Sequence, residues 1–269
     1  MSDRYFLHLA YRGTAYRGWQ RQPGVHSVQE QVEDTLSRIL NQKITVTACG
    51  RTDAGVHARQ FYVHTNIENK WDYDLKFRLN KNLLDDIAFY DIIPVHERAH
   101  ARNDATLRTY DYFIHHHENP FLNPISSLYN LDLNVEAMAE AALLLTQYND
   151  FAGLCKSPVR YENTICEVSD VKLYVNPNKD LLRFQISADR FLRGMVRIIV
   201  HELLEIGQGH SGKDRLEAIL RDNAEVGEKF LAHPQGLHLS EVHYSYINMP
   251  TKTDIFSSLD DYQNLVVRV

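Results

Sequence analysis

The first part of the chain alternates hydrophobic and polar residues in a way that predicts a strand. Over Arg4–Tyr11 the residues Tyr5, Leu7 and Leu9 share one side of a period-2 pattern, which is typical of a strand. A polar loop that contains glycine follows, over residues 12–24. The chain therefore opens with a strand and a long loop before any helical pattern begins.

A helix and two further strands are expected next. Ser27 and Glu30 have the spacing of a capping box, in which the serine side chain caps the first turn of a helix. The hydrophobic residues that then recur at helical spacing are Val28, Val32, Leu36, Ile39 and Leu40. A strand over 44–48 leads through Gly50 into a short loop, 51–57, and another strand runs through 61–63.

The second half repeats this order of strand and helix. A strand pattern at Tyr110, Tyr112 and Ile114 begins a second unit near residue 105. The later expected elements are a helix over 134–147, strands over 171–175 and 181–186 joined by a turn at 176–180, a helix over 191–206 that stops at Gly207, and a strand over 242–247. Strands followed by helices in both halves indicate mixed antiparallel sheets with helices packed on one face.

We therefore expect two domains, 1–105 and 106–250, and a C-terminal tail, 251–269, to which the sequence assigns no role. The composition is that of a globular protein, with 44% hydrophobic, 24% charged and 10% aromatic residues, which excludes the disordered and collagen-like classes. No run approaches the about 18 apolar residues of a membrane helix. Because the first residues also lack the basic and apolar regions of a signal peptide, we expect a cytoplasmic protein.

The charge is distributed unevenly. The net charge is −6, which argues against a protein coated in basic residues for indiscriminate binding of nucleic acid. Residues 1–60 nevertheless hold eight Lys and Arg against five Asp and Glu, and residues 183–222 hold seven against six. A basic surface that faces an anionic partner is possible if these two segments meet in space.

The cysteine and histidine patterns do not favour a metal site. The three cysteines are far apart and outside any CxxC pair, which argues against a disulfide framework and a thiolate zinc site: Cys49, Cys155 and Cys166. His115, His116 and His117 are consecutive in a predicted strand, so their side chains alternate between its faces and cannot converge on one ion. We expect no metal.

The loop GRTDAGVHA, residues 50–58, holds the densest group of chemically capable side chains. Asp53 can serve as a nucleophile or a base, and Arg51 and His57 can bind an anion or a ribose. The two glycines allow the backbone to approach a ligand closely. A surface turn whose aspartate bonds to its own backbone would have the same residues, so spacing alone leaves both interpretations open.

The helix expected over 191–206 combines a cationic stripe with an apolar stripe. At 3.6 residues per turn, Arg190, Arg193, Arg197 and His201 lie on one side. The apolar stripe contains Leu192, Met195, Val196, Ile199 and Leu203. An ordinary solvated face gives the same pattern, whereas one arginine that reaches a buried carboxylate would favour its ionised form and fix its orientation.

Tyr110 and Tyr112 face the same side of their predicted strand. Aromatic side chains in this position usually pack in a core. The alternative is a platform on which an unpaired base stacks, since stacking on an aromatic ring does not require the base to be identified.

These segments together resemble the TruA-type tRNA pseudouridine synthases. The loop GRTDAGVHA at 50–58 is similar to the catalytic signature of that family, and the resemblance covers about residues 4–247. The other similar segments are Tyr16 with 18–22 and 27–30, 100–102 with Arg108, Tyr110 and Tyr112, 195–197 with Ile199 and Val200, and Gly236, Leu237, Leu239, Val242 and Tyr244.

The resemblance implies an α+β fold of the pseudouridine synthase type, with two sheet-and-helix domains around a central cleft and mainly antiparallel sheets. It also implies that uridine is isomerised to pseudouridine at positions 38, 39 and 40 of the tRNA anticodon arm, without a cofactor. A homodimer that grips one tRNA across both subunits is a further implication.

The resemblance also suggests a role for each candidate site residue. Asp53 is the catalytic aspartate, Arg51 helps to extrude the target nucleotide, Tyr110 stacks on the target base, and Arg197 is the partner of the aspartate. His57 is expected to contact the substrate. A uridine in a stem must leave the stack before its glycosidic bond can be reached, which fits an arginine and a stacking tyrosine. The carboxylate can add to the sugar or the base, or take a ribose proton, and the sequence does not choose.

Three positions depart from the family pattern. His201 stands where the helix usually continues with glycine, His233 replaces a small residue, and Asn163 stands where arginine is common. Two other functions compete with the enzyme: a protein that binds tRNA without modifying it, and a metal-dependent hydrolase that uses the histidines. An intact Asp53 argues against the first, and the strand geometry of the histidines argues against the second.

Overall fold

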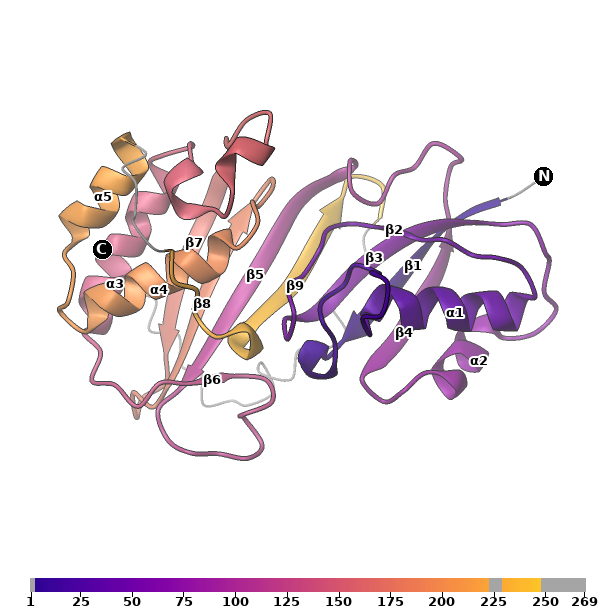
Figure 1. Ribbon diagram of the computed structural model, residues 1–269, viewed down its shortest axis with the longest axis horizontal. Coiled ribbons are helices and arrows are strands. Elements are labelled where there is room, and N and C mark those ends of the chain that lie inside the picture. The colour runs from indigo at the N-terminus through magenta and orange to yellow at the C-terminus, as the bar shows by residue number, and fades with distance from the viewer. Residues whose placement is uncertain (1–2, 223–228, 248–269) are drawn as a thin grey trace. The chain divides into compact units, whose positions relative to one another are not determined.

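The computed structural model describes residues 3–222 and 229–247 of the chain and shows two compact units (Figure 1). The first unit holds residues 3–106 and 238–247, and the second holds 107–222 and 229–237. The predicted second domain, 106–250, includes the last strand, which the structure places in the first unit. The predicted tail, 251–269, lies outside the described residues.

The first unit is built on a sheet whose main strands are β4 (Ile87–Pro94), β1 (Asp3–Tyr11), β3 (His57–Ile67) and β9 (Leu237–Tyr244), in that order. The short β2 (Thr47–Ala48) also pairs with β3. β1 is antiparallel to both of its neighbours, whereas β9 runs parallel to β3 with His57 opposite His238. The last of the described strands therefore pairs with β3 at the point where the loop 51–57 ends.

β1 is a central strand, and both of its faces are buried. The side chains of Phe6, Leu7, His8 and Leu9 are completely inaccessible to solvent. The ring of His8 stacks on that of Tyr62 with 4.7 Å between centroids. The strand predicted over residues 4–11 is confirmed, and its burial on two faces agrees with its place between β3 and β4.

Helix α1 (Val28–Leu40) begins and ends as its sequence predicts. The Ser27 hydroxyl accepts a hydrogen bond from the Glu30 N–H at 3.3 Å, and Asn41 ends the helix in a left-handed conformation. Val28, Val32 and Leu36 are fully buried, which contributes about 1.5–3 kcal/mol for each side chain. Local capping and the apolar stripe together account for this helix.

The strand expected over 44–48 is reduced to β2 because α1 takes two of its backbone donors. The Ile44 N–H donates to the Ser37 hydroxyl at 2.9 Å, and the Val46 N–H donates to the buried Glu33 carboxylate at 3.1 Å. Backbone groups that pair with side chains in this way are not available to a sheet. The segment consequently follows the helix before it joins β3.

Helix α2 (Leu75–Asn82) and strand β4 complete the first unit and were not assigned from the sequence. The Asp74 carboxylate caps α2 by accepting the Phe77 N–H at 2.9 Å. The helix packs against β4 and α1. Only two of its residues, Leu75 and Leu79, are buried, so its apolar stripe is too short to stand out in the sequence.

The second unit contains an antiparallel sheet with the strand order β5 (Ala105–His115), β8 (Leu181–Ala188) and β7 (Val168–Val175). The short β6 (Ser127–Leu128) runs parallel to β5. The hairpin between β7 and β8 turns at 176–180, as predicted, because the Asn176 side-chain oxygen accepts from the Asp180 and Leu181 N–H groups. Lys179 adopts a positive φ of 59° in this turn.

Residues 107–222 and 229–237 of the second unit contain three α-helices: α3 (Val135–Ala142), α4 (Met195–Gly207) and α5 (Lys213–Asp222). α3 packs against α4, α5 and β7, and Figure 1 shows the three helices beside the β7–β8 hairpin. Short 3₁₀ helices in the two units lie at Gly13–Ala15, Leu143–Thr146, Ala152–Leu154, Pro158–Arg160 and Pro234–Gly236. The predicted helix over 134–147 is thus α3 followed by a 3₁₀ turn.

Two expectations from the sequence need correction. The pairing of β3 with β9 and of β5 with β6 is parallel, so the strand pairing is mixed and the prediction of mainly antiparallel sheets is not confirmed. The helix predicted from residue 191 begins at Met195, because Gly194 has a left-handed φ of 72°. Arg190 and Arg193 consequently precede α4 and do not share a helical stripe with Arg197.

None of the helices in residues 3–222 and 229–247 combines the length and the apolar character that crossing a membrane requires.

Candidate active site

Asp53 lies in the loop 51–57, which connects the end of β2 to β3 in the first unit. Its side chain is partly exposed, that of Arg51 is exposed, and Thr52 is buried. The loop turns tightly, since the Val56 N–H donates to the Asp53 carbonyl at 3.2 Å and Gly55 has a positive φ of 78°. The carboxylate therefore reaches solvent from a backbone that is itself hydrogen-bonded.

Residues 13–19, which we name the brace, hold this loop at three points. The Gly13 N–H donates to His57 Nδ1 at 3.0 Å, and the Trp19 N–H donates to the Thr52 carbonyl at 3.1 Å. In the opposite direction, the Gly55 N–H donates to the Tyr16 carbonyl at 3.3 Å. The loop is therefore fixed immediately before Asp53 and again two and four residues after it.

Two glycines allow the brace to approach the loop so closely. A Cβ atom at Gly13 would lie 1.9 Å from the Val56 carbonyl oxygen, and one at Gly18 would lie 2.7 Å from the Thr52 carbonyl oxygen. Gly18 also has a positive φ of 95°, which residues with a side chain rarely adopt. Backbone against backbone is the only packing that these distances allow.

Side chains support the brace and the loop from behind. The Tyr11 hydroxyl and the Thr52 hydroxyl share a hydrogen bond of 2.8 Å. The Tyr16 hydroxyl donates to the Asp86 carboxylate at 2.7 Å, and Tyr16 is only 2% exposed. Burial, followed by this hydrogen bond, raises the pKa of Tyr16 far above its usual range, so the hydroxyl stays protonated and remains a donor.

His57 is part of this support. Its ring is 2% exposed, Nδ1 accepts from Gly13, and the ring lies beside that of His238 with 4.5 Å between centroids. Because Nδ1 is the acceptor, the neutral ring carries its proton on Nε2. The structure places the ring in the contact between loop and brace, and the contact with the substrate that the sequence suggested stays a prediction.

The other candidate residues lie in the second unit. Tyr110 on β5 is 9% exposed. Its ring makes an edge-to-face contact with the ring of Phe191, with 5.0 Å between the centroids. Tyr112, on the same side of the strand, is fully buried; its hydroxyl donates to the His233 carbonyl at 2.8 Å and is hydrogen-bonded to the Ser127 hydroxyl at 2.9 Å. Of the two tyrosines, Tyr112 is thus a core residue.

Arg197 stands in the first turn of α4. Its Nε donates to the Ala232 carbonyl at 2.7 Å, and the Ala232 N–H donates to the Arg197 carbonyl at 3.0 Å. The guanidinium group is therefore oriented by residues of its own unit. Two of the positions that depart from the family pattern flank this region, with the His201 ring beside Phe230 and the His233 ring beside Tyr129.

Asn163, the third departing position, lies in the same unit. Its side-chain oxygen accepts from the Ile165 N–H at 3.2 Å and from Arg190 at 3.4 Å.

The consecutive histidines serve the fold of the second unit. His115 bonds to Ser126 through Nδ1 and to Asn123 through Nε2, and His116 Nδ1 bonds to the Tyr129 carbonyl. In the part of the chain that the structure describes, no group of three or more His, Cys, Asp or Glu residues is placed to hold a metal ion.

The three cysteines are buried thiols, and burial raises the pKa of Cys166 to about 12.

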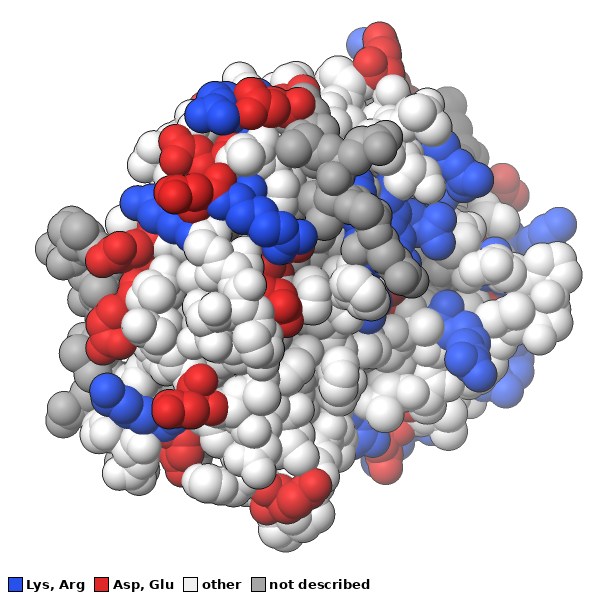
Figure 2. Space-filling view, turned by 60° about the vertical axis from the view of Figure 1, so that its left-hand side comes forward, with Lys and Arg blue, Asp and Glu red and all other residues white. Residues whose placement is uncertain are grey.

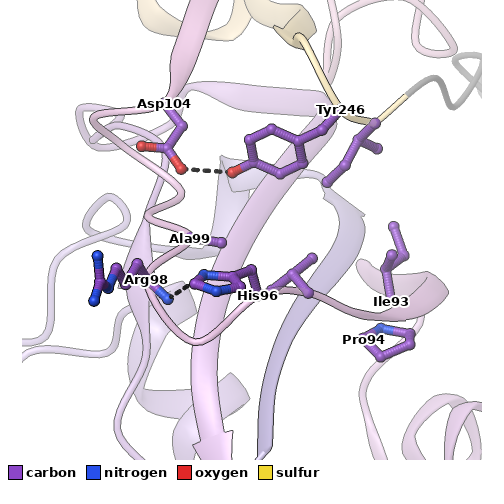
Figure 3. Close-up of a pocket in the computed structure, with 9 residues that line it drawn as sticks. Ile93, Pro94, His96, Arg98, Ala99, Asp104 and Tyr246 are labelled. Atoms are coloured by element: carbon purple, nitrogen blue, oxygen red, sulfur yellow. Dashed lines mark hydrogen bonds between the residues drawn. The ribbon is translucent and has the colours of Figure 1, made fainter.

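A hollow of about 460 Å³ lies elsewhere in the first unit, at the end of β4 (Figure 3). Its wall includes Ile93, Pro94 and Tyr246, and the Tyr246 hydroxyl donates to Asp104 at 2.6 Å. Burial alone would raise the pKa of Asp104, but the hydrogen bonds from Tyr246 and the His100 N–H lower it below the usual value. None of the candidate site residues lines this hollow.

The sequence alone did not show the brace as a structural element. Residues 12–24 were predicted only as a polar loop, and the partner of Tyr16, Asp86, is 70 residues away in the chain. A signal was nonetheless present, because Gly13 and Gly18 bracket an aromatic residue, Tyr16, in the loop that precedes the helix cap.

Comparisons with known proteins point to one family. A family model described as tRNA pseudouridine synthase matches residues 141–245. The tRNA pseudouridine synthase A of Azobacteroides pseudotrichonymphae is 37% identical over 243 residues, which cover 90% of this chain and 97% of the relative. The enzymes of the same name from Porphyromonas gingivalis (38% over 248 residues, 90% and 97% coverage) and Bacteroides thetaiotaomicron (37% over 261 residues, 96% and 97% coverage) are similarly close.

Replacing Gly13 with alanine should disturb the loop 51–57, because the new methyl group would overlap the Val56 carbonyl. We expect a loss of about 1–3 kcal/mol in the free energy of unfolding and faster hydrogen exchange at the Gly55 and Val56 amides. Gly50→Ala is the matched control, since a Cβ there meets nothing within 4 Å. Unchanged protection of the two amides in Gly13→Ala would contradict the brace.

Proposed function

The chain belongs to the tRNA pseudouridine synthase A family, so it isomerises uridine to pseudouridine in tRNA, and we propose that Asp53 is the carboxylate that carries out the reaction. The observation that supports this role most strongly is the brace. It holds the backbone on both sides of Asp53 while the side chain remains partly exposed. A reacting group needs this combination of fixed position and access.

The reaction needs no external reactant. The bond between N1 of uracil and C1′ of ribose breaks, a bond between C5 and C1′ forms, and the proton lost from C5 is balanced by one gained at N1. A carboxylate can assist by adding to the sugar or the base, or by taking a ribose proton. Each of these routes places an Asp53 oxygen against the target nucleotide.

Arg51 is proposed to extrude that nucleotide. Its side chain is exposed beside Asp53, and within the described residues no carboxylate lies within 4 Å of it. A cation in this state can bind a phosphate or occupy the space that a flipped base leaves. Tyr110 is proposed as the aromatic ring that stacks on the extruded base, a role for which its low exposure provides an apolar setting.

We further propose that the targets are positions 38, 39 and 40 in the anticodon arm, as the family resemblance implies. The surface does not carry a uniform basic coat. On the face shown in Figure 2, acidic and basic side chains are interspersed and wide uncharged areas separate them. Attraction to RNA must then come from local groups of cations rather than from the net charge of −6.

Localisation in the cytoplasm fits a tRNA substrate and remains a prediction from the sequence.

Replacing Asp53 with asparagine should abolish product and preserve binding. The amide keeps the size of the side chain and removes its charge, so we expect a loss of about 10³-fold or more in rate with nearly unchanged affinity for a tRNA transcript. Asp85→Asn, an exposed position in the same unit, is the control. Base-specific chemical labelling measures pseudouridine, and filter binding measures affinity.

Three outcomes of that experiment are informative. Full activity in Asp53→Asn would exclude Asp53 as the catalyst. Binding of tRNA without any product from the wild-type protein would favour the non-catalytic tRNA-binding protein. Loss of product in Asp53→Asn alone, with Asp85→Asn active, would support the proposal.

Arg197 is proposed as the cationic partner of the aspartate. Arg197→Met should then lower kcat by about 10²-fold, because the aspartate would lose the cation that orients it and favours its ionised form, and change KM much less. Arg193→Met, an exposed arginine that precedes α4, is the control. A full kcat in Arg197→Met would refute the pairing.

We also propose that the protein acts as a homodimer that grips one tRNA with both subunits. Two copies would combine their local cationic groups on one substrate, which suits a chain with a negative net charge. Sedimentation of the purified protein saturated with tRNA should give the mass of two protein chains and one tRNA. A complex with a single chain would contradict the proposal.

A further inference from the structure

Two more arginines stand beside residues that contact the loop of Asp53. We propose that Arg12 and Arg17, together with Arg51, bind phosphate groups of the RNA strand that carries the target uridine. We name these three residues the arginine rim. The inference rests on the proposed function, since it takes the ligand to be tRNA, and it adds two substrate-binding residues outside the loop.

The brace determines where the two arginines lie. Arg12 directly precedes Gly13, whose N–H bonds to His57 at the end of the loop. Arg17 stands between Tyr16, which accepts the Gly55 N–H, and Gly18, which packs on the Thr52 carbonyl. Since consecutive Cα atoms are about 3.8 Å apart, each arginine is one residue away from a direct contact with the loop.

Both arginines also have a fixed backbone. The Arg12 N–H donates to the Asp86 carbonyl at 2.8 Å, and the Arg17 N–H donates to the His26 carbonyl at 3.0 Å. Their side chains are exposed. A cation on a rigid backbone loses less freedom when it binds an anion, because only the side chain has to be ordered.

The charges of the rim are not used by the fold. Among residues 3–222 and 229–247, no carboxylate forms an ion pair with Arg12, Arg17 or Arg51. Arg21, only four residues after Arg17, shows the contrast, because it is paired with Glu33 at 3.2 Å and Asp34 at 2.8 Å. The charges of the rim are therefore not neutralised by an ion pair within the described residues.

The chemistry of arginine identifies the ligand group. The planar guanidinium donates two parallel hydrogen bonds to phosphate, and phosphate contacts fix the register of a nucleic acid on a protein. An extruded nucleotide has one phosphate on each side, and its neighbours along the strand carry more. The three cations of the rim outnumber the two carboxylates, Asp53 and Asp86, that the loop and brace contain or contact, which favours the binding of a polyanion.

The dependence of tRNA affinity on salt tests the rim. The double variant Arg12→Gln and Arg17→Gln is compared with the double variant Lys43→Gln and Lys76→Gln, which removes two exposed cations of the same unit away from the brace. Both pairs are introduced into Asp53→Asn so that the tRNA transcript is not converted. Affinity is measured over a series of KCl concentrations.

Affinity falls as salt rises, so the slope of log K against log[salt] is negative. Each lost phosphate contact lowers the magnitude of this slope by about 0.7–0.9. We expect the arginine pair to lower it by about 1.5 and the lysine pair to leave it unchanged. Arg12→Lys with Arg17→Lys should keep most of the slope, because the charges remain. With Asp53 intact, the arginine pair should raise KM for tRNA and leave kcat at saturation unchanged.

The contrary results separate the rim from the proposed function. An unchanged slope in the arginine pair, or an equal decrease in both pairs, would overturn the rim while the effect of Asp53→Asn on product still tests the enzyme. A wild-type protein that neither binds nor modifies tRNA would overturn both.

Discussion

The site depends on one close contact, that of the brace with the loop of Asp53. Two backbone segments approach each other at Gly13 and Gly18 more closely than any side chain would permit. Hydrogen bonds in both directions then join them before and after Asp53. Because backbone groups cannot rotate away as side chains can, the carboxylate is fixed to the sheet of the first unit through its own main chain.

This contact explains why several buried polar residues are present. Tyr16 reaches Asp86, Tyr11 reaches Thr52, and His57 accepts from Gly13. Each of these bonds satisfies a buried group and at the same time restricts either the loop or the brace that holds it. In our account the site is therefore organised before RNA arrives, and the exposed arginines around it remain available for phosphate groups.

Much of the fold could be predicted from local sequence, because caps and periodicity are local. α1 with its Ser27 cap and the hairpin at 176–180 follow the expected pattern. The sequence could not show that α1 takes the donors of Ile44 and Val46, or that β9 returns to pair in parallel with β3, because these contacts join distant residues. The site residues were suggested by a motif, but the contact of the brace and the burial of His57 required coordinates.

The most direct test of the central claim maps pseudouridine in tRNA from cells that lack this gene. A base-specific chemical label is applied before and after the wild-type protein or its Asp53→Asn variant is restored. The account predicts that the mark at positions 38, 39 and 40 is lost, that the wild-type protein restores it, and that the variant does not. Unchanged marks at every uridine of the tRNA in the deletion strain would contradict it.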